Sequence, residues 1–208
     1  MYFFRAIVCS GLIICWCLAA GWAWAGPAGV EIRVYCDSQT MEVVSEGRVL
    51  HLFSVQLGEK GCDKAQEGDK KTPIGTYRIT WLVSQGKVCG QGQATIKGAT
   101  WCREQDSALV LGGPVPANQT CTEELWRPGY GRHGVVIGLD YPNEEDKAGG
   151  KTGSCIQIHG STRKGMKSGS AGCIKLLDQD ALTLCQIINP AETLVTITSS
   201  RQMKIDLK

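Results

Sequence analysis

The residues best suited to chemistry are a histidine and a cysteine that lie 14 positions apart. The segment Ile156-Gln-Ile-His-Gly160 predicts a buried strand that ends at His159 and Gly160. The segment Ser170-Ala-Gly-Cys-Ile-Lys-Leu176 predicts a glycine-flanked turn, with Cys173 just before a helix that begins near Asp178. A cysteine attacks as its thiolate, and an adjacent imidazole or a helix N-terminus lowers its pKa. The pair therefore predicts Cys173 as nucleophile and His159 as general base.

The turn around the cysteine has residues suited to holding an acyl intermediate. The backbone N–H groups of Gly172 and Cys173 are candidates for an oxyanion hole, and glycine lets the chain bend so that they face a substrate. Ser170 is either a substrate contact or a turn hydroxyl that bonds its own backbone. For an arbitrary cysteine in an exported protein a disulfide is the usual role, but the Ser-x-Gly-Cys context favours a nucleophile.

These motifs resemble the L,D-transpeptidase catalytic domain family (YkuD type). The family signature has His-Gly followed by Ser-x-Gly-Cys, and an upstream element that here is Gly68-Asp-Lys-Lys-Thr-Pro-Ile-Gly-Thr-Tyr77. The resemblance covers Val30 to Thr198. A third element, Leu139-Asp-Tyr-Pro-Asn143 with the glycines that follow, resembles a periplasmic branch that trims or detaches peptidoglycan-linked groups.

The resemblance implies a thioester acyl-enzyme formed on Cys173 from a peptidoglycan stem peptide, without a cofactor. It also implies that a backbone carbonyl near Gly160 orients the His159 ring. Two positions depart from the family pattern, because Ala171 stands where His is frequent and Lys175 where Arg is common. Lysine keeps the charge but not the bidentate fork of arginine.

Candidate substrate-binding residues are Ser170, Arg163, Lys175 and Tyr141. Arg163 belongs to a basic loop between His159 and Cys173, which could dock a stem carboxylate. A charge run is more often a solvated surface, and that alternative stays open.

Residues 1–25 read as a signal peptide. Arg5 precedes an apolar run, and Ala23-Trp-Ala25 is a cleavage pattern of small residues. The alternative is an uncleaved membrane anchor. We expect cleavage, export to the periplasm or cell envelope, and no stable membrane insertion. Residues 26–208 then suit one catalytic domain.

Composition narrows the partners further. The chain has 22 Lys and Arg against 20 Asp and Glu, which does not favour nucleic-acid binding. Eight of the 11 cysteines follow the signal segment, and in an exported chain most should form disulfides. One expected pair is Cys89 with Cys102, closing a hairpin or flap. No cysteines have the short paired spacing typical of zinc sites, so we expect no metal.

The pattern along the chain predicts a mainly β domain. The expected elements are strands within 30–35, 41–44, 49–55, 76–82, 109–111, 134–139 and 193–198, a strand before His159, and a helix over 178–188. Family resemblance refines this to a single β-sandwich-like L,D-transpeptidase domain of mixed sheets with one or two packed helices. Transpeptidation is the expected activity. Hydrolysis by the same site, a non-catalytic wall-binding module and a disulfide-stabilised interaction domain remain alternatives.

Overall fold

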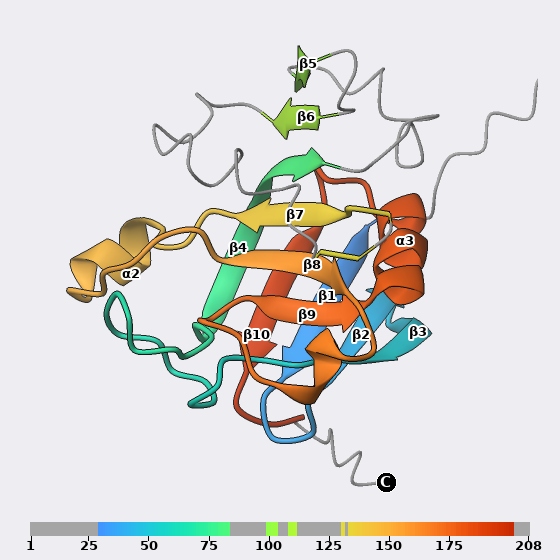
Figure 1. The fold of residues 1–208 in the computed structure, drawn as a ribbon. Coiled ribbons are helices and arrows are strands. Elements are labelled where there is room, and N and C mark those ends of the chain that lie inside the picture. Colours follow the sequence, from blue (N-terminus) through green and yellow to red (C-terminus); the bar gives the residue numbers. More distant parts are fainter. Residues whose placement is uncertain (1–28, 84–98, 104–107, 112–129, 132, 202–208) are drawn as a thin grey trace, which may run out of the picture.

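The strands of this protein form one mixed sheet that folds over on itself (Figure 1). The computed structural model describes residues 29–83, 99–103, 108–111, 130–131 and 133–201. The strands are β1 (Val30–Tyr35), β2 (Thr40–Ser45), β3 (Arg48–Ser54), β4 (Gly75–Val83), β5 (Ala99–Arg103), β6 (Ala108–Leu111), β7 (Val136–Leu139), β8 (Gln157–Ser161), β9 (Ile174–Leu177) and β10 (Leu194–Thr198). The helices are α2 (Glu144–Ala148), the 3₁₀ turn η3 (Gly165–Lys167) and α3 (Asp178–Ile187).

Strand order explains the sandwich-like shape. Hydrogen-bonded neighbours run β3-β2-β1-β10-β4-β7-β8-β9, with β6 also pairing with β4 and β5 with β6. The pairs β1–β10 and β8–β9 are parallel, whereas the others are antiparallel. The nine-residue β4 belongs to both halves, because its first part pairs with β10 and its last part with β6 and β7. A bridge from Gln56, just beyond β3, to Lys175 in β9 joins the two ends of the order.

Alternating side chains build the core. In β1, Ile32 and Val34 are fully buried while Glu31 and Arg33 are partly exposed, which is the alternation that the sequence predicts. The helix α3 places Ala181, Leu184 and Cys185 in the same core and packs against β8 and β9. The strands that carry the site are therefore supported by buried apolar contacts.

The predicted fold class is confirmed, and the predicted strands and the helix over 178–188 are present with ends shifted by a few residues. Two elements differ from the sequence expectation: β9 follows Cys173 directly, and α2 forms in a segment expected to be a polar loop. The signal segment and Cys89, with its expected disulfide to Cys102, lie outside the described residues. Within the part of the chain that is described, no helix is long and apolar enough to cross a membrane.

Candidate active site

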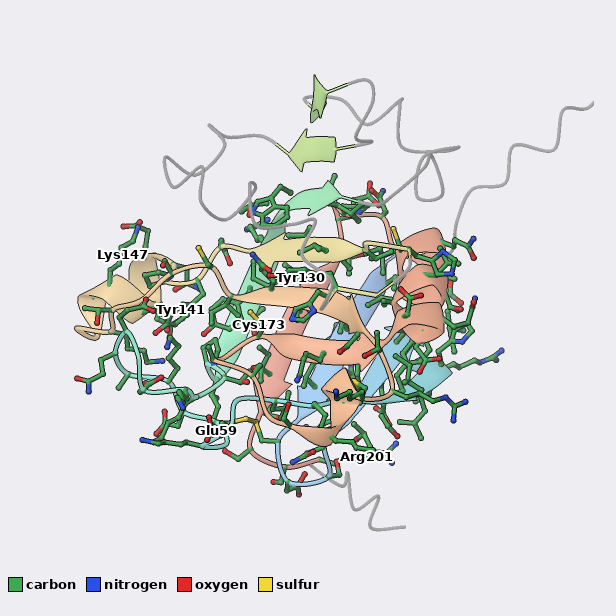
Figure 2. All side chains as sticks on the ribbon, in the orientation of Figure 1. Glu59, Tyr130, Tyr141, Lys147, Cys173 and Arg201 are labelled. Carbon is green, nitrogen blue, oxygen red and sulfur yellow. A yellow bond between two sulfur atoms is a disulfide. The ribbon has the colours of Figure 1, made fainter. Side chains whose placement is uncertain are left out.

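The pairing of β8 with β9 brings the two candidate catalytic residues to one face of the sheet. These strands are parallel, with Ile158 opposite Ile174 and His159 opposite Lys175. Cys173 comes one residue before β9, so it lies beside Gln157. Side chains two residues apart on a strand leave the same face. His159 and Cys173 are therefore diagonal neighbours on that face, and Figure 2 shows Cys173 among these strands.

His159 is held in one orientation by its own backbone and by an aromatic ring. Its side chain is 9 % exposed, and its Nδ1 lies 2.8 Å from the Gly160 carbonyl oxygen. A carbonyl can only accept, so Nδ1 carries the proton and Nε2 is the free base. The Tyr130 ring packs edge-on against the imidazole with ring centroids 4.6 Å apart. The contact with Gly160 is the one that the family resemblance implies.

Cys173 has a free thiol in a protein whose other described cysteine side chains are oxidised. Cys36 and Cys62 form a disulfide, and Cys155 and Cys185 are also disulfide-bonded. The half-buried Cys173 thiol donates to the Cys155 carbonyl oxygen at 3.4 Å. The thiol is thus available for chemistry.

The predicted helix begins at Asp178, as expected, but Cys173 does not lie at its start. The residues Ile174–Leu177 continue as β9, and α3 begins only at Asp178. The reason is that this short apolar run bonds to β8 and fills the core. The N-terminus of α3 is therefore separated from the sulfur by β9 and does not stabilise a thiolate there.

Burial keeps both candidate residues uncharged at rest. It raises the pKa of the Cys173 thiol to about 11, although the Gln157 backbone N–H that bonds the sulfur and the nearby Lys64 and Lys175 charges act in the other direction. Burial also lowers the pKa of His159 to about 4, with the Gly160 hydrogen bond opposing it and the Lys175 charge adding to it. The resting pair at neutral pH is a thiol and a neutral imidazole rather than an ion pair.

The loop before Cys173 is closed by Ser170. Its hydroxyl donates to the Cys173 carbonyl oxygen at 2.5 Å and accepts from the Gly172 N–H at 2.9 Å. Ser170 therefore acts as a turn hydroxyl in this structure. The Gly172 N–H is engaged, which leaves the Cys173 N–H as the candidate oxyanion donor.

The segment with the upstream motif, residues 68–77, packs against the loop that precedes Cys173. Asp69 accepts hydrogen bonds from the buried Lys64 ammonium at 2.9 Å and from three backbone N–H groups, and Thr72 accepts from the Gly58 N–H at 2.8 Å. The Lys71 carbonyl lies so close to Gly172 that a Cβ there would be 2.7 Å from the oxygen. The two sequence motifs thus meet at the backbone next to Cys173.

Lys175 is a structural residue here rather than a substrate contact. The residue is 8 % exposed. Its ammonium donates to the carbonyl oxygens of Gly165 at 2.7 Å, Ser168 at 2.6 Å and Gly169 at 3.4 Å. Three partners use the three ammonium protons. None is left for a stem carboxylate, and the contacts instead fasten the loop between His159 and Cys173.

The other two candidate substrate residues, Arg163 and Tyr141, have different surroundings. Arg163 is exposed and follows the C-terminal end of β8, whereas Cys173 precedes β9; because these strands are parallel, the two residues lie at opposite ends. Tyr141 is buried, packs against Tyr77 and donates to the Thr152 carbonyl at 3.0 Å, toward α2 in Figure 2. Burial raises the Tyr141 pKa to about 12, so its hydroxyl remains a donor.

Four contributors to the site were not singled out from the sequence: Lys64, Tyr130, Cys155 and Gln157. Gln157 alternates with His159 on one strand, so the period of two would have identified it. Lys64, Tyr130 and Cys155 come from distant segments and contribute a buried charge, an aromatic ring and a backbone carbonyl. No local sequence pattern marks these contributions. Among the described residues, no three His, Cys, Asp or Glu side chains gather in a way that could hold a metal ion.

Comparison with known proteins identifies the class. The family model described as the L,D-transpeptidase catalytic domain (YkuD) matches residues 29–197, which is most of the chain. The protein therefore belongs to the L,D-transpeptidase catalytic domain family. A search of curated proteins found no match.

Solved structures share the fold. The helical cell shape determining protein Pgp2 from Campylobacter jejuni is 21 % identical with a TM-score of 0.53, over 84 % of this chain and 49 % of that chain. Bd1075 from Bdellovibrio bacteriovorus is 21 % identical with a TM-score of 0.50, over 82 % of this chain and 48 % of that chain. An L,D-transpeptidase from Stackebrandtia nassauensis aligns at 16 % identity and a TM-score of 0.41, over 83 % and 57 % of the two chains. The chain matches about half the length of these proteins.

Proposed function

We propose that this protein is an exported, cofactor-independent acyltransferase that acts on peptidoglycan stem peptides in the periplasm through Cys173. The observation that carries the proposal is a free thiol beside a histidine whose Nδ1 is fixed by Gly160, within an L,D-transpeptidase fold. The structural neighbour from Campylobacter jejuni is a cell shape determining protein, which supports a role in the cell wall.

The first half of the reaction follows from the resting charges. On substrate binding, His159 Nε2 takes the thiol proton and the sulfur attacks the carbonyl carbon of the L-centre before the terminal D-alanine. The oxyanion that forms is bound by the Cys173 N–H. Its collapse breaks the carbon–nitrogen bond, and the imidazolium gives its proton to the leaving amine. The products are free D-alanine and a thioester on Cys173.

The second half decides between transferase and hydrolase. His159 takes a proton from the incoming nucleophile, which attacks the thioester and restores the thiol. An amine gives a cross-link or an exchanged terminal residue, whereas water gives a trimmed stem or a detached lipoprotein. The Tyr141 element that suggested the hydrolytic branch is a core contact here. We propose transpeptidation as the primary activity, because the matching family is the L,D-transpeptidase catalytic domain.

The test is incubation of the mature protein with disaccharide-tetrapeptide, with and without an added D-amino acid, followed by mass spectrometry. We expect exchange of the terminal D-alanine and a thioester adduct, both absent in Cys173→Ala. Loss of D-alanine without exchange would assign a hydrolase. Tight peptidoglycan binding that is unaffected by Cys173→Ala and occurs without turnover would instead assign a wall-binding module. An oxidised Cys173 in the purified protein would favour the interaction domain.

A further inference from the structure

One buried polar atom beside the thiol has no partner. The Gln157 side chain is 4 % exposed, and its Oε1 makes no hydrogen bond to a described residue. Within the same described set, the Thr193 hydroxyl is the other such buried oxygen. Leaving a buried acceptor unpaired costs about 1–3 kcal/mol, so such a group calls for an explanation.

The position of Gln157 in the sheet links it to the site. It is the register neighbour of Cys173 on one side and pairs with Gly138 of β7 on the other. Its backbone N–H already bonds the Cys173 sulfur. Its side chain leaves the same face as His159, two residues along the strand.

The strand next to Gln157 carries no side chain at the paired position, because the residue there is Gly138. A Cβ at Gly138 would lie 2.1 Å from the buried Trp81 indole, so the indole occupies the place where a side chain of β7 would stand. The row across this face is therefore Trp81, Gly138, Gln157 and Cys173. The indole lies on one side of Gln157 and Cys173 on the other, and Oε1 bonds to neither, which points to a partner that arrives with the substrate.

We propose that the Gln157 carboxamide oxygen accepts a hydrogen bond from the peptide N–H of the stem residue whose carbonyl Cys173 attacks. This inference rests on the proposed function. That N–H is two bonds from the attacked carbon, and neighbouring strands are about 4.8 Å apart, so an acceptor beside the nucleophile can reach it. The leaving amine must face His159, and the residue that is retained as the acyl group lies on the other side of the attacked carbonyl. The retained N–H is therefore the donor left for Gln157.

The contact defines the acyl donor. A site with a buried acceptor selects substrates that bring a donor, because an analogue without one leaves the acceptor unpaired. The acyl donor is thus a stem residue that is joined through a secondary amide on its N-terminal side. An ester at that position is a poor substrate.

The experiment compares two substrates and three proteins. The substrates are the disaccharide-tetrapeptide and its analogue in which an ester oxygen replaces that N–H. The proteins are the wild type, Gln157→Met, which keeps the side-chain length without the acceptor, and Thr193→Val. Thr193 serves as the matched control because it precedes β10, three strands from β8 in the sheet order. The measurements are kcat/KM for release of D-alanine and the rate of Cys173 alkylation by iodoacetamide.

For the wild type and Thr193→Val we expect a preference of about tenfold for the amide over the ester. Gln157→Met should lose about tenfold in kcat/KM on the amide and show no preference, with its alkylation rate unchanged. An amide preference that persists in Gln157→Met would overturn the inference. If that variant does not fold, equal wild-type activity on both substrates would overturn it. A wild type that releases no D-alanine would overturn the proposed function, and the inference with it.

Discussion

Burial moves the pKa values of Cys173 and His159 in opposite directions, and both shifts remove charge from the resting site. A neutral thiol reacts slowly with oxidants and adventitious electrophiles. In the proposed reaction, the proton transfer to His159 then belongs to the substrate-bound state, where an acyl oxyanion and its donor replace solvent. At the residue scale, these resting charges fit the proposed function only if substrate binding activates the Cys173 thiol.

The pH dependence of thiol reactivity tests this directly. Because the Cys173 pKa is raised to about 11, the thiolate fraction of the free enzyme grows through the alkaline range. We expect the iodoacetamide rate to rise about tenfold per pH unit from about pH 7 to about pH 10. A stopped-flow or mass-spectrometric rate profile measures this. A plateau that begins below pH 7 would indicate a thiolate–imidazolium pair instead.

Lys175 offers a second test at this scale. Lys175→Met leaves three carbonyls without their buried donor, so we expect a loss of about 2–4 kcal/mol in the free energy of unfolding and a lower kcat. Lys164→Met, at an exposed position in the same loop, should change stability by less than about 0.5 kcal/mol. Urea unfolding of both variants gives the comparison. Equal stability of the two would contradict the anchoring role.

At the level of elements, the turn between η3 and β9 is set by one backbone position. Gly172 has φ +142° and no room for a Cβ, whereas Gly150 has φ +74° in open space. Gly150→Ala should cost about 1–2 kcal/mol from strain alone. Gly172→Ala adds the clash with Lys71 and Ile156, so it should cost more and displace the nucleophile. Thermal unfolding and D-alanine release measure both effects, and equal losses in the two variants would exclude the clash.

How far the sequence predicts these elements depends on their length and pattern. The alternating strands and the helical spacing of α3 were predicted because burial follows a fixed period. The strand β9 is not predicted, because its four residues Ile174–Leu177 come directly before α3 and are too few to show the alternation of a strand. The helix α2 was missed because its five residues depend on a cap: Asn143 accepts from the Asp146 N–H and Asp146 accepts in return. The candidate catalytic pair is predicted from motif spacing, whereas the contacts of Lys175 and Tyr141 are made only in the folded chain.

For the whole molecule, the disulfide between Cys36 and Cys62 connects the end of β1 to the segment that carries the upstream motif. It closes a loop with a sequence separation of 26 residues, so a Cys36→Ser/Cys62→Ser variant should lose about 3 kcal/mol of stability. Urea unfolding under non-reducing conditions tests this. An unchanged midpoint would mean that packing alone holds the segment beneath Gly172.

The place of β10 within the sheet has a consequence for how the chain reaches its fold. This strand, from near the end of the sequence, lies between β1 and β4 and bonds to both. During synthesis from the N-terminus, β1 and β4 therefore have unpaired edges until residues 194–198 emerge. Closure over such a sequence distance is slow. The sheet is therefore completed only once residues 194–198 have been synthesised, and until then β1 and β4 each keep an open edge with which another strand can pair.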